Sequence, residues 1–163
     1  MPWTPNLSVG ISMIDDQHKM WFEKAEALFE AGRNNKAKEY VGELLTFLDD
    51  YTKKHFSDEE KYMISINYPG YADQKKAHTA FIEQLTKLRG EYNSSGGNLL
   101  VILNANQMIL DWLTKHISNM DKKISDYAKS AVSFCFREMM RFLRGFKSSG
   151  FKPSFCVKNP VFK

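Results

Sequence analysis

The stretch His55-Phe56-Ser57-Asp58-Glu59-Glu60 lies in the middle of a long helical pattern and places an imidazole and a carboxylate four residues apart. Side chains at this spacing project from the same face of a helix. A single pair of this kind is most often found on a solvated helix surface. This chain, however, has only four histidines, and the pattern around them predicts that each lies on a different helix of one bundle. We therefore expect His55 and Glu59 to face the interior of that bundle.

Four segments carry apolar residues at three- and four-residue steps, which predicts four helices. The first segment opens with Ser12-x-x-Asp15, a plausible capping box, and residues 1–11 are expected to form an extended arm whose apolar side chains pack on the fold. Turns rich in Gly, Asn, Pro and Ser separate the segments. The expected helices cover residues 12–32, 37–66, 72–92 and 99–117. This order predicts an all-α fold, an up-down-up-down four-helix bundle.

His55 and Glu59 continue the apolar stripe that Leu48 and Tyr51 carry on the second expected helix, so both should be buried. Glu60 should instead point to solvent. No Lys or Arg lies on this stripe, and a buried carboxylate needs a compensating charge. A metal cation would supply that charge.

The other histidines fall at matching depths of the expected bundle. Glu59 and His78 are equally far in sequence from the middle of the turn at residues 67–70, and His78 and His116 lie about 18 and 20 residues from the middle of the next turn. His18 lies on or beside the apolar stripe of the first helix. A tetrahedral zinc ion takes four ligands, fewer than the four histidines and the two carboxylates, Glu59 and Asp121, that this chain offers, and this count favours two ions. Imidazole and carboxylate ligands without thiolate suit iron, zinc or manganese.

The spacing of His116 and Asp121 requires a departure from regular helix geometry. Residues five apart are rotated by about 140° on a regular α-helix. A π-type widening would bring both side chains to one face, and such bulges are frequent at functional sites. We therefore predict a distorted turn between His116 and Asp121, or a helix end that lets Asp121 turn inward.

Over about residues 1–125 the chain resembles the hemerythrin family, specifically the bacterial single-domain hemerythrins. The ferritin-like alternative is disfavoured, because no histidine has a Glu three residues before it. The resemblance rests on five motifs: Asp15-Asp16-Gln17-His18, His55-Phe56-x-x-Glu59-Glu60, Tyr68-Pro69, His78-x-x-Phe81 and Trp112-Leu113-x-x-His116-Ile117-x-x-x-Asp121. It implies a protein that binds dioxygen reversibly, for storage, delivery or sensing, and that is not an enzyme.

The resemblance also implies a non-haem di-iron centre with a bridging oxo or hydroxo group. The implied metal ligands are His18 and His55 on the iron with an open position, His78 and His116 on the other iron, and Glu59 and Asp121 as bridges. The side chains implied to line the oxygen pocket are Phe56, Trp112, Leu113 and Ile117. These apolar side chains would keep the pocket dry, and they are also ordinary material for a bundle core.

The sequence departs from the family at one implied ligand. The third helix of a hemerythrin normally carries His-x-x-x-His, whereas this chain has Gln74 at the first of these positions and His78 at the second. An amide oxygen could coordinate iron weakly, or the amide could hold a water molecule on the iron. Either arrangement leaves that iron more open, which raises the alternative of a di-iron peroxidase or oxidase.

The net charge of +4 is unevenly distributed. Residues 122–163 carry ten Lys and Arg against two acidic residues, and residues 1–121 carry 13 basic and 17 acidic residues. We therefore expect a hemerythrin-like domain at 1–125 and a basic amphipathic helical extension at 126–163. The extension could dock on the bundle, mediate self-association or bind a membrane surface. A third candidate function is thus an interaction module, either metal-free or metal-dependent, that acts through this extension.

The composition of the chain bears on its cellular location and on its partners. The chain has no apolar run of about 18 residues, and its first residues lack the pattern of a signal peptide. We therefore expect a cytoplasmic protein, and we expect no nucleic-acid partner. The two cysteines, Cys135 and Cys156, lie near the C-terminus and away from every histidine, so neither a disulfide framework nor a Cys/His zinc site is suggested.

Overall fold

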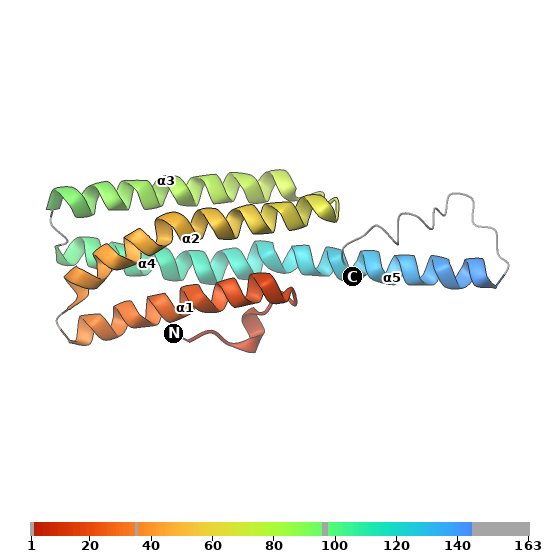
Figure 1. Ribbon diagram of the computed structural model, residues 1–163, viewed down its shortest axis with the longest axis horizontal. Helices are drawn as coiled ribbons and strands as arrows, with labels where there is room; N and C mark the ends of the chain where they lie inside the picture. Colours follow the sequence, from red (N-terminus) through yellow and green to blue (C-terminus); the bar gives the residue numbers. More distant parts are fainter. Residues whose placement is uncertain (1, 35, 96–97, 145–163) are drawn as a thin grey trace.

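The computed structural model describes residues 2–34, 36–95 and 98–144. Its elements are a short 3-10 helix η1 (Pro5–Leu7), α1 (Ser12–Arg33), α2 (Ala37–Ser65), α3 (Tyr71–Ser95), α4 (Leu99–His116), the π-helical turn η2 (Ile117–Asp121) and α5 (Lys122–Leu143). Helices α1 to α4 lie alongside one another, and α5 continues the line of α4 past the end of the other three (Figure 1). The predicted four-helix bundle is therefore confirmed.

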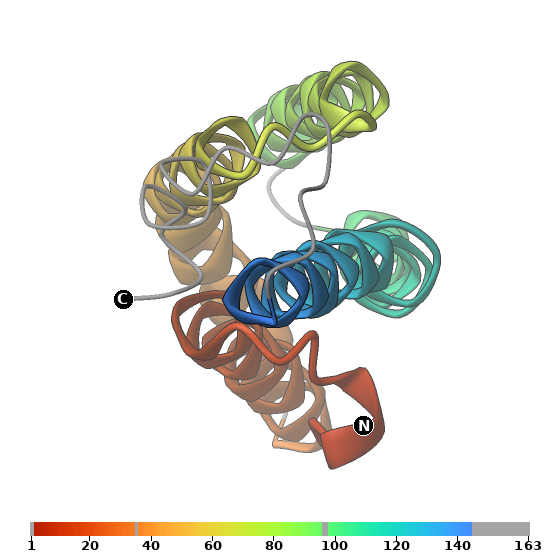
Figure 2. The ribbon, with the colours of Figure 1, turned by 90° about the vertical axis from the view of Figure 1, so that its right-hand side faces the viewer.

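Helices α1 to α4 pack in a ring around a shared core. Helix α1 contacts α2 and α4, and α3 contacts α2 and α4, as the end-on view in Figure 2 also shows. Trp21, Phe81, Leu45 and Ile109 from the four helices are each at most 1% exposed. Complete burial of an aliphatic or Phe side chain contributes about 1.5–3 kcal/mol to folding, so this core holds the helices in register around the polar site described below.

The first helix begins differently from the sequence prediction. Ser12 is the first helical residue and the N-cap residue, Ile11, makes no side-chain cap hydrogen bond, so the predicted capping box was wrong. The Asp15 carboxylate turns back instead and accepts hydrogen bonds from the backbone N–H groups of Val9 and Gly10 at 2.7 and 3.1 Å. Gly10 has a φ of +70°, which glycine adopts without steric cost.

The expected extended arm contains the 3-10 turn η1, and Trp3, Leu7 and Ile11 pack against the core as predicted. Helix α3 also runs to Ser95 rather than ending at Tyr92. The hydroxyls of Ser94 and Ser95 both donate to the Glu91 carbonyl, at 3.1 and 2.7 Å. These bonds support one further helical turn beyond the predicted end.

Helix α5 starts inside the predicted domain and passes residue 125 without a break. Its first turns belong to the bundle, because Ile124 and Ala128 pack with Met63 and Ile66 in a small core cluster at the end of α2. A division between residues 125 and 126 stays a prediction, and residues 145–163 of the predicted extension lie outside the described part of the chain. Within the described residues, no helix combines the length and the apolar character needed to cross a membrane.

Candidate metal centre

The bundle interior holds all six side chains that the sequence suggested as metal ligands. The exposed fractions of His18, His55, Glu59, His78, His116 and Asp121 range from 0 to 5%. Each histidine comes from a different helix of the bundle, in the order α1 to α4. The predicted convergence of the four histidines is visible in the ring distances: the centroids of His18 and His55 lie 5.0 Å apart, and those of His78 and His116 lie 5.3 Å apart.

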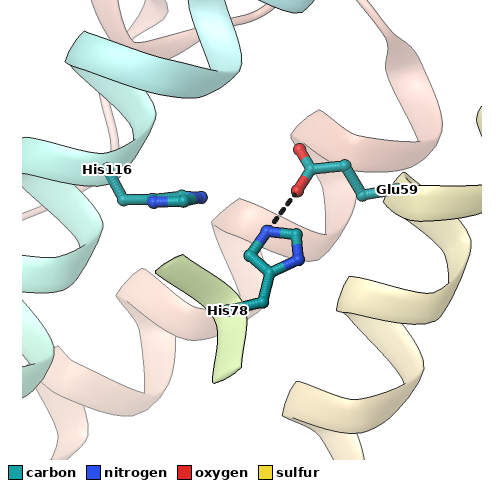
Figure 3. A group of neighbouring side chains, drawn as sticks. All are labelled: Glu59, His78 and His116. Atoms are coloured by element: carbon teal, nitrogen blue, oxygen red, sulfur yellow. Dashed lines mark ion pairs between the residues drawn. The ribbon is translucent and has the colours of Figure 1, made fainter. Parts of the chain in front are cut away.

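Glu59, His78 and His116 face one another across three helices (Figure 3). One ligand atom from each lies within 4.8 Å of the others, which is close enough to surround a single ion. Glu59 Oε2 lies 3.0 Å from His78 Nε2. Their equal sequence separation from the α2–α3 turn predicted that Glu59 and His78 lie at the same depth of the bundle, and this contact confirms it.

The Asp121 carboxylate lies between His18 of the first helix and His116 of the fourth. Its two carboxylate oxygens lie 3.4 Å from His18 Nε2 and 3.0 Å from His116 Nε2. The π-helical turn Ile117–Asp121 makes this possible, because it brings Asp121 onto the same side of the helix as His116. The distorted turn predicted from the five-residue spacing is thus confirmed. His55 lies beside His18, but its ring has no carboxylate within 4.0 Å among the residues that the structure describes.

These short contacts leave most of the polar atoms of the site without a well-formed hydrogen bond. Both oxygens of Glu59, the Nε2 atoms of His18, His78 and His116, and one oxygen of Asp121 are buried without a hydrogen-bond partner among the described residues. Buried polar atoms in proteins are nearly always hydrogen-bonded. Here the donor atoms converge on shared points instead of pairing, and their chemistry of imidazole nitrogen and carboxylate oxygen fits a metal cation.

Burial favours the neutral forms of His55, His78 and Glu59. Burial lowers the pKa of His55 and of His78 below the usual histidine value, which favours the neutral imidazole that binds metals. Burial and the nearby Asp121 carboxylate raise the pKa of Glu59 well above its usual range. Burial alone would also raise the pKa of Asp121, but the adjacent imidazoles of His116 and His18 hold it well below the usual value. A cation between these groups would compensate both carboxylates.

A second layer of side chains orients two of the imidazoles. Gln17 is buried, and its Oε1 accepts a hydrogen bond from His55 Nδ1 at 2.8 Å. Glu60 Oε1 lies 3.1 Å from His78 Nδ1, so the prediction that Glu60 points to solvent was wrong. The reason is that Glu60 lies on the side of α2 that faces α3, where its side chain reaches His78. Its distance from the α2–α3 turn, almost equal to that of His78, could have indicated this contact.

Gln74, at the departure from the family pattern, is also inside the site and only 1% exposed. Its Nε2 donates to Asp121 Oδ1 at 3.1 Å, and its Oε1 is buried without a hydrogen-bond partner among the described residues. The resemblance placed Gln74 at a candidate ligand position, but nothing in the sequence indicated its contact with Asp121.

Aromatic and aliphatic side chains surround the polar atoms. Phe56 stacks on His78 with ring centroids 3.9 Å apart, and Trp112 stacks on His116 at 4.0 Å. Leu113 and Ile117 are at most 1% exposed and belong to the main core cluster. All four side chains that the resemblance assigned to a dry pocket thus lie in or against the core.

Comparison with known proteins agrees with this geometry. The family model described as the hemerythrin HHE cation binding domain matches residues 9–128. The chain is 31% identical to a bacteriohemerythrin of Stenotrophomonas maltophilia, with 83% of this chain and 86% of that protein covered. It is also 31% identical to the myohemerythrin of Sipunculus nudus, with 74% and 88% covered. A bacteriohemerythrin of Methylococcus capsulatus is 28% identical, with 75% and 92% covered. The chain belongs to the hemerythrin family of HHE cation-binding domains.

Proposed function

We propose that this protein binds two iron ions inside its bundle and binds dioxygen reversibly at that centre, for storage, delivery or sensing. The observation that carries the proposal is the group of buried imidazole and carboxylate atoms that converge without hydrogen-bond partners. Membership of the hemerythrin family supports it, because the resemblance implies an oxygen carrier rather than an enzyme. We also infer a cytoplasmic location, and we propose that the basic extension mediates self-association or binds a membrane surface.

The proposed ligands divide between the two ions. His18 and His55 would hold the first ion, His78 and His116 the second, and Glu59 and Asp121 would bridge the two. When bound, two ferrous ions supply the electrons that reversible dioxygen binding requires.

The surrounding residues would protect the centre. Phe56, Trp112, Leu113 and Ile117 place apolar surface against the ligands, and such walls slow the entry of water, protons and anions. The hydrogen bonds of His55 to Gln17 and of His78 to Glu60 hold a proton on each Nδ1. Each Nε2 is thereby left free to act as the donor to metal.

One observation favours a second candidate, a di-iron peroxidase or oxidase. The Gln74 amide donates to Asp121, and its oxygen is buried without a partner among the described residues. An amide is a weaker donor to iron than an imidazole, so the ion held by His78 and His116 would be less completely enclosed. A less enclosed ion favours reaction with peroxide over stable oxygen binding.

Anaerobic loading of the full-length protein with ferrous iron tests the proposal. We expect elemental analysis to give two irons per chain, and we expect addition and removal of oxygen to change the absorption spectrum reversibly over several cycles. Replacement of Glu59 by Ala should abolish most of the iron uptake, because it removes a bridge. One metal or none in the wild-type protein would contradict the di-iron assignment. Irreversible oxidation on the first exposure would favour the enzymatic candidate.

A further inference from the structure

Two imidazoles of the candidate centre are supported by different chemical groups. His78 Nδ1 lies 3.1 Å from the carboxylate of Glu60, and His55 Nδ1 lies 2.8 Å from the amide oxygen of Gln17. A carboxylate can only accept a hydrogen bond, so His78 must donate from Nδ1. The contact thus fixes the tautomer of His78, with Nε2 directed at Glu59 and available to a metal.

The orientation of the Gln17 amide is fixed in the same way. Gln17 Nε2 donates to the Asp58 carboxylate at 2.9 Å, which leaves the amide oxygen facing His55. His55 therefore also donates from Nδ1, but to a neutral acceptor. The two histidines consequently share a tautomer and differ in the charge of the group behind them.

This difference in charge has a chemical consequence. A hydrogen bond to an ionised acceptor is roughly twice as strong as a bond between neutral groups. A carboxylate behind a metal-binding histidine also makes the imidazole a stronger donor. We propose that Glu60 is a positioning residue that makes His78 a stronger metal donor than His55, so that the two ends of the centre differ in metal affinity and reduction potential. The inference rests on the proposed di-iron centre.

The surroundings of Glu60 argue against a purely structural surface role. Its other oxygen lies 4.0 Å from the Nζ atom of Lys75 and accepts a weak hydrogen bond from the Tyr71 hydroxyl at 3.5 Å. The Lys75 side chain is 58% exposed, and an exposed ion pair of this length contributes little to stability. The shorter contact, to the buried His78, is the one in which the charge of Glu60 has its largest effect.

Replacement of Glu60 by Gln isolates that charge. The variant keeps an oxygen that can accept from His78 Nδ1, so the ring orientation is preserved while the negative charge is lost. Gln17→Glu, made in an Asp58→Asn background so that two carboxylates do not face each other, makes the opposite change behind His55. Glu83→Gln is the matched control, since Glu83 is exposed on the same helix as His78 and the substitution removes the same charge without touching an imidazole.

Two measurements on the full-length protein decide the inference. The first is binding of Co²⁺ to the metal-free protein, followed by absorption, and the second is the midpoint potential of the iron-loaded protein. We expect Glu60→Gln to weaken one Co²⁺ binding step by about 10–100-fold and to raise the midpoint potential. If the ferric ion loses tenfold more affinity than the ferrous ion, the rise is about 59 mV. Gln17→Glu should lower the potential, and Glu83→Gln should leave both quantities at their wild-type values.

The outcomes separate this inference from the proposed function. Wild-type affinity and potential in Glu60→Gln, with unchanged circular dichroism, would overturn the role of Glu60 while leaving the di-iron centre intact. The same result in Gln17→Glu would confirm that groups behind the imidazoles do not tune the centre. A wild-type protein that binds neither Co²⁺ nor iron would overturn both proposals. Normal metal binding without reversible oxygenation would contradict the proposed function alone.

Discussion

At the scale of single residues, Glu59 is where folding and metal binding make opposite demands. The side chain is 0% exposed, and neither of its oxygens has a hydrogen-bond partner among the described residues. In the metal-free protein, Glu59 either remains a buried charge or takes up a proton against its usual preference, and both states reduce the stability of the fold. A bound cation would turn the same carboxylate into a stabilising group.

The first prediction therefore concerns Glu59→Gln. In the presence of a chelator we expect the variant to be more stable than the wild type by about 1–3 kcal/mol, because an unpaired buried charge is removed. After iron loading the order should reverse, since the amide cannot replace a bridging carboxylate. Urea unfolding with and without iron measures both differences. The exposed Glu83→Gln should change neither by more than about 0.5 kcal/mol, and a variant with the same order in both conditions would show that Glu59 does not bind the metal.

Gln74 is the second residue with a testable effect. The amide holds Asp121 but leaves its own oxygen unpartnered in the site, so the ion nearest to it should be more accessible than with a histidine at this position. We predict that oxygenated wild-type protein decays to the ferric state faster than Gln74→His. A barrier difference of about 1.4 kcal/mol, the size of one ordinary hydrogen bond, corresponds to about tenfold in rate.

Autoxidation rates of the two proteins, at the same pH and azide concentration, measure this difference. Gln74→His should also bind azide less readily, because its second iron has one position fewer to offer. Equal rates would show that the apolar walls alone set the lifetime, and the enzymatic candidate would then lose its main support.

At the scale of the elements, the π-helical turn Ile117–Asp121 links the fourth helix to the site. A π-type turn has poorer backbone geometry than an α-helix and usually persists at functional sites. Here it brings Asp121 to within 3.0 Å of His116, so a metal bound by both side chains would close the turn from the inside.

We therefore predict that metal slows hydrogen exchange in this turn. Removal of iron with a chelator should speed up exchange of the amides of residues 117–122 more than exchange near the start of α4, at residues 101–106. The physical reason is that local opening of the turn would have to break the metal contacts of His116 and Asp121. Mass spectrometry of deuterated peptides measures both segments. Equal exchange with and without metal would argue that Asp121 is not a ligand.

The elements also show what the sequence could and could not predict. Apolar periodicity identified the four helices, and equal distances from the turns identified which histidines meet. The five-residue spacing of His116 and Asp121 predicted the π turn because an α-helix cannot align them. Each of these predictions depends on helix geometry alone.

Contacts between a helix and its neighbours were harder to predict. Periodicity separates core from solvent, but Glu60 lies at the boundary between α2 and α3, where it reaches His78. Asp15 bonds to the loop before α1 because Gly10 turns with a positive φ. The Gln74 amide can donate to Asp121 only because the π-helical turn directs Asp121 into the bundle. Such contacts depend on the relative position of two elements, which no single segment encodes.

At the scale of the whole molecule, α5 raises the question of where the metal-binding unit ends. The helix is continuous with η2, and its first turns contribute Ile124 and Ala128 to the small core cluster with Met63 and Ile66. Farther along, Phe134 and Phe136 are both 57% exposed, as α5 extends past the bundle (Figure 1). The family model also ends its match at residue 128.

These observations predict that a chain ending at Lys129 folds and binds metal like the full-length protein. It keeps every proposed ligand and both α5 side chains of the small cluster, so iron content and the oxygenated spectrum should be unchanged. Ile124→Ala in the full-length chain provides the contrast, because it leaves a cavity beside Met63 and should lower the free energy of unfolding by about 2–5 kcal/mol. Iron analysis and thermal unfolding of both proteins measure the two effects. If the shortened chain loses iron or unfolds while Ile124→Ala is mild, then residues beyond 129 support the bundle, and the division into a metal-binding domain and an extension is wrong.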